Sequence, residues 1–194
     1  MGMTTERWSR ATVYPDMWTD PDDDPREVLA DPVGEKETLW NYLKHYRLTL
    51  EMKCDGLDAE QMARRSVPPS TMSLLGLVRH LAHVEQSWFQ RVLQGREELP
   101  RLFGKSEDRP DADFDGAVAD PAVVADAWES WRREVRDADA WMETLPEDGL
   151  GATVTRRGDQ IPVRDVLVHM VEEYARHVGH ADLLRECIDG RVGQ

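Results

Sequence analysis

The sequence is poor in cysteine and in basic charge, and it has no long apolar run. Two cysteines among 194 residues, Cys54 and Cys187, are too few for a disulfide framework, so we expect half-buried thiols in a reducing cytoplasm. The 24 lysines and arginines are outnumbered by 38 acidic residues, and the net charge is −14. That charge argues against a nucleic acid or an anionic membrane as partner, because both bind a basic face. No stretch approaches the roughly 18 apolar residues of a membrane span, and the first ten residues lack the apolar segment of a secretory signal. These deficits predict a cytoplasmic protein that binds neither nucleic acid nor membrane.

The length is sufficient for one domain with a sizeable core. Residues 1–34 combine four prolines with many acidic side chains and three large aromatics, Trp8, Tyr14 and Trp18. Disordered tails are poor in aromatics, so we expect an extended N-terminal arm that lies on the domain. Residues 35–190 are expected to form that domain.

Apolar residues recur at helical spacing in four long segments, which predicts an all-α fold. The four expected helices span residues 35–54, 73–95, 121–145 and 162–190. Residues 58–65 predict one short helical turn, and the polar stretch 96–120 predicts a long crossover loop. Two short alternating runs around Arg157 and Gly158 predict a small hairpin within residues 150–162. Four amphipathic helices with one long crossover are typical of a four-helix bundle.

The last expected helix carries a carboxylate and several histidines along one face. At about 100° per residue, His177 and His180 fall within about 60° of Glu173, and His169 joins them on the other side. Apolar residues continue this stripe at both ends, so it should face the interior. A buried glutamate needs a partner. A metal ion and Arg47, on the inner face of the first helix, are the two candidates.

A single ion cannot bind all of these side chains, because His169 and His180 lie about 16 Å apart along the helix axis. Another helix must therefore supply a ligand. On the second helix His80 borders the apolar stripe, whereas His83 is expected nearer to solvent. His45 lies opposite the apolar face of the first helix and is expected at the surface. The geometry favours His80 as the ligand across the bundle, although a histidine in such a position can also be simply hydrogen-bonded.

The segments SLLGLVRHLAHVEQSWF and HMVEEYARHVGHADLLRECIDG resemble the DinB-like superfamily of small four-helix-bundle metalloproteins, in its actinobacterial branch of unknown function. The resemblance covers about residues 35–190. The superfamily places one metal-binding histidine on the second helix and two ligands four residues apart on the last helix, followed by a short run that ends in Leu-Arg. Carried over to this sequence, the resemblance implies His80, Glu173 and His177 as ligands. Most members have histidine where this chain has Glu173, but the mycothiol-dependent maleylpyruvate isomerase of the same superfamily uses two histidines and one glutamate.

Two further histidines stay open as alternatives. His180 is expected either to contact a ligand or to replace Glu173 in the ligand set, and His83 is a weaker candidate for the same roles. Three protein ligands leave open coordination positions, as in catalytic zinc sites. Zinc is therefore favoured, with nickel or iron as alternatives, because this ligand set suits several divalent ions.

Members of the superfamily imply a low-molecular-weight thiol such as mycothiol as cosubstrate, with a metal-activated thiolate and transferase or isomerase chemistry. Arg47 and Arg176 are candidates to hold a carboxylate of the thiol or of a small-molecule substrate. The resemblance also implies a homodimer. Two alternatives remain: a stress-related bundle that binds metal or ligand without turnover, and a metal-dependent hydrolase. The sequence does not name the substrate or any catalytic residue beyond the ligands.

Overall fold

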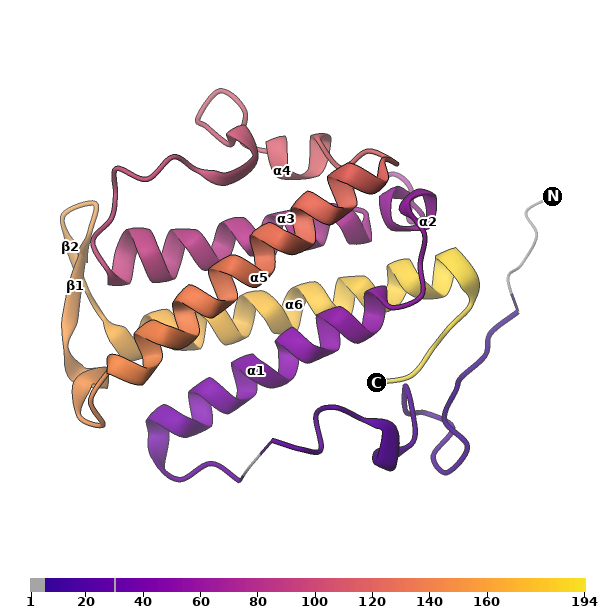
Figure 1. Ribbon diagram of the computed structural model, residues 1–194, viewed down its shortest axis with the longest axis horizontal. Coiled ribbons are helices and arrows are strands. Elements are labelled where there is room, and N and C mark those ends of the chain that lie inside the picture. The colour runs from indigo at the N-terminus through magenta and orange to yellow at the C-terminus, as the bar shows by residue number, and fades with distance from the viewer. Residues whose placement is uncertain (1–5, 30) are drawn as a thin grey trace.

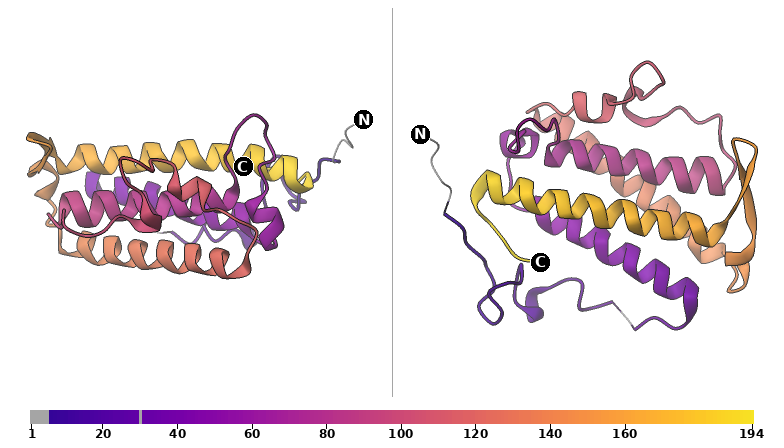
Figure 2. Two further views of the ribbon diagram at one scale, coloured as in Figure 1. Left: turned by 90° about the horizontal axis from the view of Figure 1, so that it is seen from above. Right: turned by 180° about the vertical axis from the view of Figure 1, so that it is seen from behind.

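The computed structural model describes residues 6–29 and 31–194, and the rest of the expected N-terminal arm lies outside the described residues. Four long helices run side by side, with a two-stranded hairpin at one end (Figure 1). They are α1 (Gly34–Cys54), α3 (Leu74–Glu85), α5 (Pro121–Thr144) and α6 (Val163–Asp189). Helices α1 and α3 each pack against α6, and α3 also packs against α5 (Figure 2). The mainly helical fold is therefore confirmed.

Local signals fix several of the helix ends. The Ser73 hydroxyl accepts a hydrogen bond from the Gly76 amide and begins α3, and the Asp120 carboxylate does the same for the Ala122 amide at α5. Gly190 ends α6 in the left-handed conformation, at φ 82°, which a glycine adopts without steric cost. These are the boundaries that the sequence predicts to within one or two residues.

The smaller elements include the predicted short helical turn after α1 and the predicted hairpin, together with turns that the sequence did not predict. They are the helical turns α2 (Ala59–Ala63) and α4 (Ala112–Asp115), the 3₁₀ turns η1 (Pro21–Asp23), η3 (Leu102–Gly104) and η4 (Gly149–Gly151), and the strands β1 (Thr153–Arg156) and β2 (Asp159–Pro162). The two strands pair antiparallel, which confirms the predicted hairpin. None of the described helices combines the length and the apolar character needed to cross a membrane.

Two features of the region after α3 differ from the sequence prediction. Helix α3 continues directly into η2 (Gln86–Leu93), which has π-helical rather than α-helical hydrogen bonding. The predicted loop 96–120 contains the turns η3 and α4, and α4 packs against α3. Hydrophobic periodicity over eight residues cannot separate a π-helix from an α-helix, and a four-residue helix is too short to produce a periodic signal.

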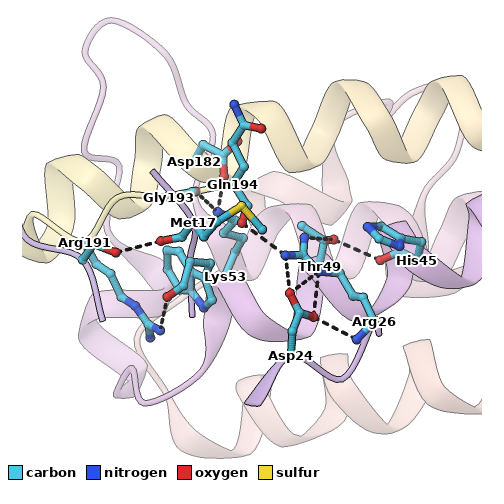
Figure 3. Close-up of polar contacts among 12 residues, drawn as sticks. Met17, Asp24, Arg26, His45, Thr49, Lys53, Asp182, Arg191, Gly193 and Gln194 are labelled. Atoms are coloured by element: carbon cyan, nitrogen blue, oxygen red, sulfur yellow. Dashed lines mark hydrogen bonds and ion pairs between the residues drawn. The ribbon is translucent and has the colours of Figure 1, made fainter. Parts of the chain in front are cut away.

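The described part of the N-terminal arm lies on the helices and on the C-terminal tail. The Trp18 side chain is 2% exposed, and its backbone amide donates to the carbonyl of Gln194 at 3.1 Å. The Lys53 ammonium of α1 donates to the Gly193 carbonyl at 2.5 Å and pairs with Asp182 at 2.7 Å (Figure 3). The arm and the tail are thus fastened to α1 and α6 together.

Both cysteines are free thiols, but their environments differ. Cys54 is buried and Cys187 is exposed. The expectation that both are half-buried is therefore wrong, because Cys54 at the end of α1 lies in the core cluster.

Candidate metal centre

The structure brings three of the predicted ligands together between α3 and α6. One potential ligand atom from each of His80, Glu173 and His177 lies within 4.8 Å of the other two. His177 Nε2 is 3.3 Å from Glu173 Oε2, and His80 Nε2 is 4.0 Å from the same oxygen. Glu173 and His177 are one turn apart on α6, so their side chains point the same way. Helix α3 supplies His80 from across the interface.

This donor set fits a divalent ion. Zinc–nitrogen and zinc–oxygen bonds of about 2.0–2.1 Å in a tetrahedron separate the ligand atoms by about 3.4 Å. The observed separations from the Glu173 oxygen, 3.3 Å to His177 and 4.0 Å to His80, are close to that value. Two imidazoles and one carboxylate suit zinc, iron or nickel, and three ligands leave coordination positions open.

The His80 ring is oriented by Asp113 of α4. His80 Nδ1 lies 2.9 Å from Asp113 Oδ2, and the Lys105 ammonium donates to that same oxygen at 2.6 Å. Burial by itself would raise the pKa of Asp113, but the hydrogen bonds from His80 and Lys105 outweigh it and lower the pKa to about 2. An ionised carboxylate only accepts hydrogen bonds, so His80 Nδ1 carries a proton, and Nε2 is the ring nitrogen that faces Glu173. Asp113 thereby prepares His80 to be a ligand.

A close approach of α4 to α3 places Asp113 there. Phe114 stacks on the His80 ring, with centroids 5.2 Å apart, and packs over Gly76. A Cβ atom at Gly76 would lie 2.7 Å from Phe114 Cδ1, which is closer than carbon atoms pack. Asp113 could not be identified from the sequence, because it is one of many acids in a polar segment and its neighbours carry no signal of burial.

Three histidines surround the Glu173 carboxylate. The neighbouring His177 and His80 rings hold the pKa of Glu173 far below its usual value, although burial acts in the opposite direction. His169 Nε2 lies 3.4 Å from the other oxygen, Oε1, and its ring packs edge-on against Trp88. Glu173 is therefore ionised, and its Oε2 faces the other two predicted ligands, His80 and His177.

The remaining histidines lie outside the three-residue group. His180 Nδ1 is 3.3 Å from His177 Nδ1, so His180 is next to a predicted ligand. His83 is only 8% exposed, and its Nε2 is 3.2 Å from the Ser87 hydroxyl. The expectation that His83 points nearer to solvent is wrong, because the segment after η2 folds back over α3. This burial lowers the pKa of His83 to about 4. His45 is exposed on α1, as expected.

Arg47 is buried in the core, and carboxylates of the protein already bind its guanidinium group. Its side chain is 4% exposed and donates from Nε and Nη2 to the two oxygens of Glu85, at 2.8 and 2.7 Å. A second branch reaches Asp139 at 3.1 Å, and the Tyr174 hydroxyl donates to Glu85 at 2.6 Å. Both expectations for Arg47 are thus corrected: its carboxylate partner is Glu85 rather than Glu173, and its guanidinium is not free to hold a substrate. Arg176 is exposed on α6, and its contact with a thiol or substrate stays a prediction.

A helical fold with two histidines and one glutamate between two long helices has the features expected of a DinB-like protein. Residues 38–190 match the sequence profile of the mycothiol-S-transferase family, and the chain belongs to that family. A conserved protein of Enterococcus faecalis, known from a crystal structure, has a similar fold, with a TM-score of 0.60 and 14% sequence identity. That similarity covers 81% of this chain and 99% of the other. The comparison with curated proteins gave no match.

Proposed function

We propose that this chain is a metal-dependent S-transferase that uses mycothiol as its thiol, with a divalent ion bound by His80, Glu173 and His177. The four long helices form a DinB-like four-helix bundle around this centre in the proposal, and zinc is the favoured ion. The observation that carries the proposal is the approach of the three ligand atoms to within 4.8 Å, in a chain whose residues 38–190 match the mycothiol-S-transferase family. A homodimer and a cytoplasmic location stay predictions.

The bound ion would supply a Lewis acid that lowers the pKa of a coordinated thiol and keeps the sulfur as a nucleophilic thiolate. The chain's own residues prepare that centre. Asp113 fixes the His80 tautomer with Nε2 as the ligand atom. His169 contacts Glu173 Oε1 and leaves Oε2 for the centre. His180 contacts Nδ1 of His177, which keeps Nε2 of His177 directed at Glu173.

A thiol-transfer assay tests this function. Untagged protein loaded with zinc is mixed with mycothiol and 1-chloro-2,4-dinitrobenzene. A carbon–sulfur bond forms, the carbon–chlorine bond breaks, chloride leaves with the electron pair, and the thiol proton passes to solvent. We expect the protein to accelerate formation of the conjugate, and His177→Ala to reduce the acceleration by about tenfold or more.

The matched control is His45→Ala, which removes an exposed histidine of α1 and should leave the rate unchanged. A zinc-loaded protein without any mycothiol-dependent acceleration would contradict the transferase proposal. Metal-dependent hydrolysis of ester substrates without thiol would favour the hydrolase instead, and binding without turnover would favour the non-catalytic bundle.

A further inference from the structure

A cavity of about 460 Å³ lies directly beside the candidate metal centre. His80 forms part of the cavity wall, and its Nε2 also lies 4.0 Å from Glu173 Oε2. One predicted ligand therefore connects the cavity to the candidate metal centre. Val84, Trp88 and Val92 give the cavity an apolar side, and the hairpin contributes the end of β1 and the turn that follows it. A small molecule in this space would therefore lie next to the thiol that we place at the centre.

The charge of this cavity is opposite to that of the chain. Although the net charge of the protein is −14, five basic residues line the cavity and Glu97 is the single acidic residue among its described lining residues. The basic residues are Arg91, Arg101, Lys105, Arg156 and Arg157. Clefts lined by one sign of charge concentrate ligands of the opposite sign.

Most of this positive charge has no carboxylate partner. Lys105 pairs with Asp113, but within residues 6–29 and 31–194 no carboxylate lies within 4.0 Å of the charged groups of Arg101, Arg156 or Arg157. The Arg156 guanidinium instead lies 4.2 Å from the centroid of the Trp88 ring. An arginine over an aromatic ring keeps its forked donors free for a planar anion.

Two independent observations also indicate a ligand here. His83 is 8% exposed and lines the cavity, yet its Nδ1 has no hydrogen-bond partner. Buried polar atoms without partners are rare and call for an explanation. The π-helical segment η2 supplies Trp88, Arg91 and Val92 to the wall, and π-helical segments occur frequently at functional sites.

We propose that this cavity binds the electrophilic substrate and that this substrate is a planar molecule bearing a carboxylate. Arg101 and Arg156 hold the carboxylate, and Trp88 packs against the apolar part. Mycothiol carries no ionised acid group, so the unpaired cations match the other reactant. This inference rests on the proposed thiol transfer for its second substrate.

A matched pair of electrophiles tests the proposal: 4-chloro-3,5-dinitrobenzoate and the corresponding benzamide, which differ by the charge. In both, the sulfur of mycothiol forms a bond to the ring carbon, chloride leaves, and the thiol proton passes to solvent. We expect kcat/KM, corrected for the uncatalysed rates, to favour the benzoate by about tenfold or more. Arg101→Gln combined with Arg156→Gln should abolish this preference.

Arg136→Gln is the control, because Arg136 is exposed on α5 and does not line the cavity. It should leave both rates unchanged. An equal loss for the two electrophiles in the double variant would mean that the arginines act on the thiolate or on folding, and it would overturn the proposal. So would a wild-type protein without preference for the benzoate.

Binding without turnover separates this proposal from the proposed function. Calorimetry with 3,5-dinitrobenzoate and 3,5-dinitrobenzamide, which lack the leaving group, needs no mycothiol. We expect the wild-type protein to bind the benzoate about tenfold more tightly than the amide. The double variant should bind the benzoate no more tightly than the amide. Equal binding of both compounds to the wild type would overturn the anion-binding cavity even if the benzamide electrophile is turned over. Tight benzoate binding without any turnover would instead overturn the transferase.

Discussion

The hydrogen bond between Asp113 and His80 provides a quantitative test of how this fold prepares the candidate metal centre. Replacing Asp113 with asparagine keeps the side-chain volume and removes the charge that fixes the His80 tautomer. Asp113 is fully buried and lies 2.9 Å from His80 Nδ1, so water cannot easily replace the lost carboxylate oxygen. Changes to such partners of metal-binding histidines cost about 10- to 100-fold in metal affinity. That range equals about 1.4–2.7 kcal/mol, and we expect Asp113→Asn to weaken zinc binding by this amount.

The assay is competition for zinc between the protein and a chromophoric chelator at neutral pH. Lys105→Met is the matched control, because Lys105 contacts the same Asp113 oxygen at 2.6 Å without being near enough to orient the His80 ring by a hydrogen bond. It should weaken zinc binding less than Asp113→Asn does. Urea unfolding of both variants checks that they fold. An Asp113→Asn variant that folds normally and binds zinc within about twofold of the wild type would show that Asp113 does not prepare His80 for the metal.

Two further predictions follow from the core. Arg47→Leu should lower the free energy of unfolding by about 3–5 kcal/mol in urea unfolding, because it leaves Glu85 charged, buried and unpaired. The double variant Arg47→Leu with Glu85→Leu should lose less stability than the single variant. A single variant as stable as the wild type would contradict a stabilising role of the ion pair. Burial raises the pKa of the Cys54 thiol to about 12, while Cys187 is exposed. Iodoacetamide should therefore label Cys187 alone in the folded protein and both cysteines after unfolding, and mass spectrometry showing equal labelling rates in the folded state would be inconsistent with this structure.

The long helices could be predicted from the sequence because their signals are local. Pro121 begins α5 and Gly190 ends α6, and the apolar spacing between such signals identifies each helix. The π-helical segment η2 and the short helix α4 could not be predicted in this way. Their form depends on packing against α3 and on hydrogen bonds that leave no periodic pattern in eight or fewer residues.

The residues of the candidate site also differ in whether local sequence signals predict their positions. Glu173 and His177 are one turn apart on one helix, so their proximity follows from spacing alone. His80 required the apolar stripe of its own helix and the family resemblance. Asp113 and the burial of His83 depend on how the segment after η2 folds back, which single-helix geometry does not contain.

Arg47 illustrates a different limit of prediction from sequence. The helical pattern correctly places it on the inner face of α1. It does not distinguish between the inward-facing carboxylates of two other helices, and the packing selects Glu85 rather than Glu173.

The metal content of untagged protein is the decisive measurement for the proposed metal centre. Wild-type protein and the His45→Ala and His177→Ala variants are loaded with zinc, dialysed and analysed by elemental mass spectrometry. We expect one zinc ion per chain in the wild type and in His45→Ala, and none in His177→Ala. A wild-type chain that retains no metal, or a His177→Ala variant that retains as much as the wild type, would contradict the assignment of His80, Glu173 and His177 as a metal centre.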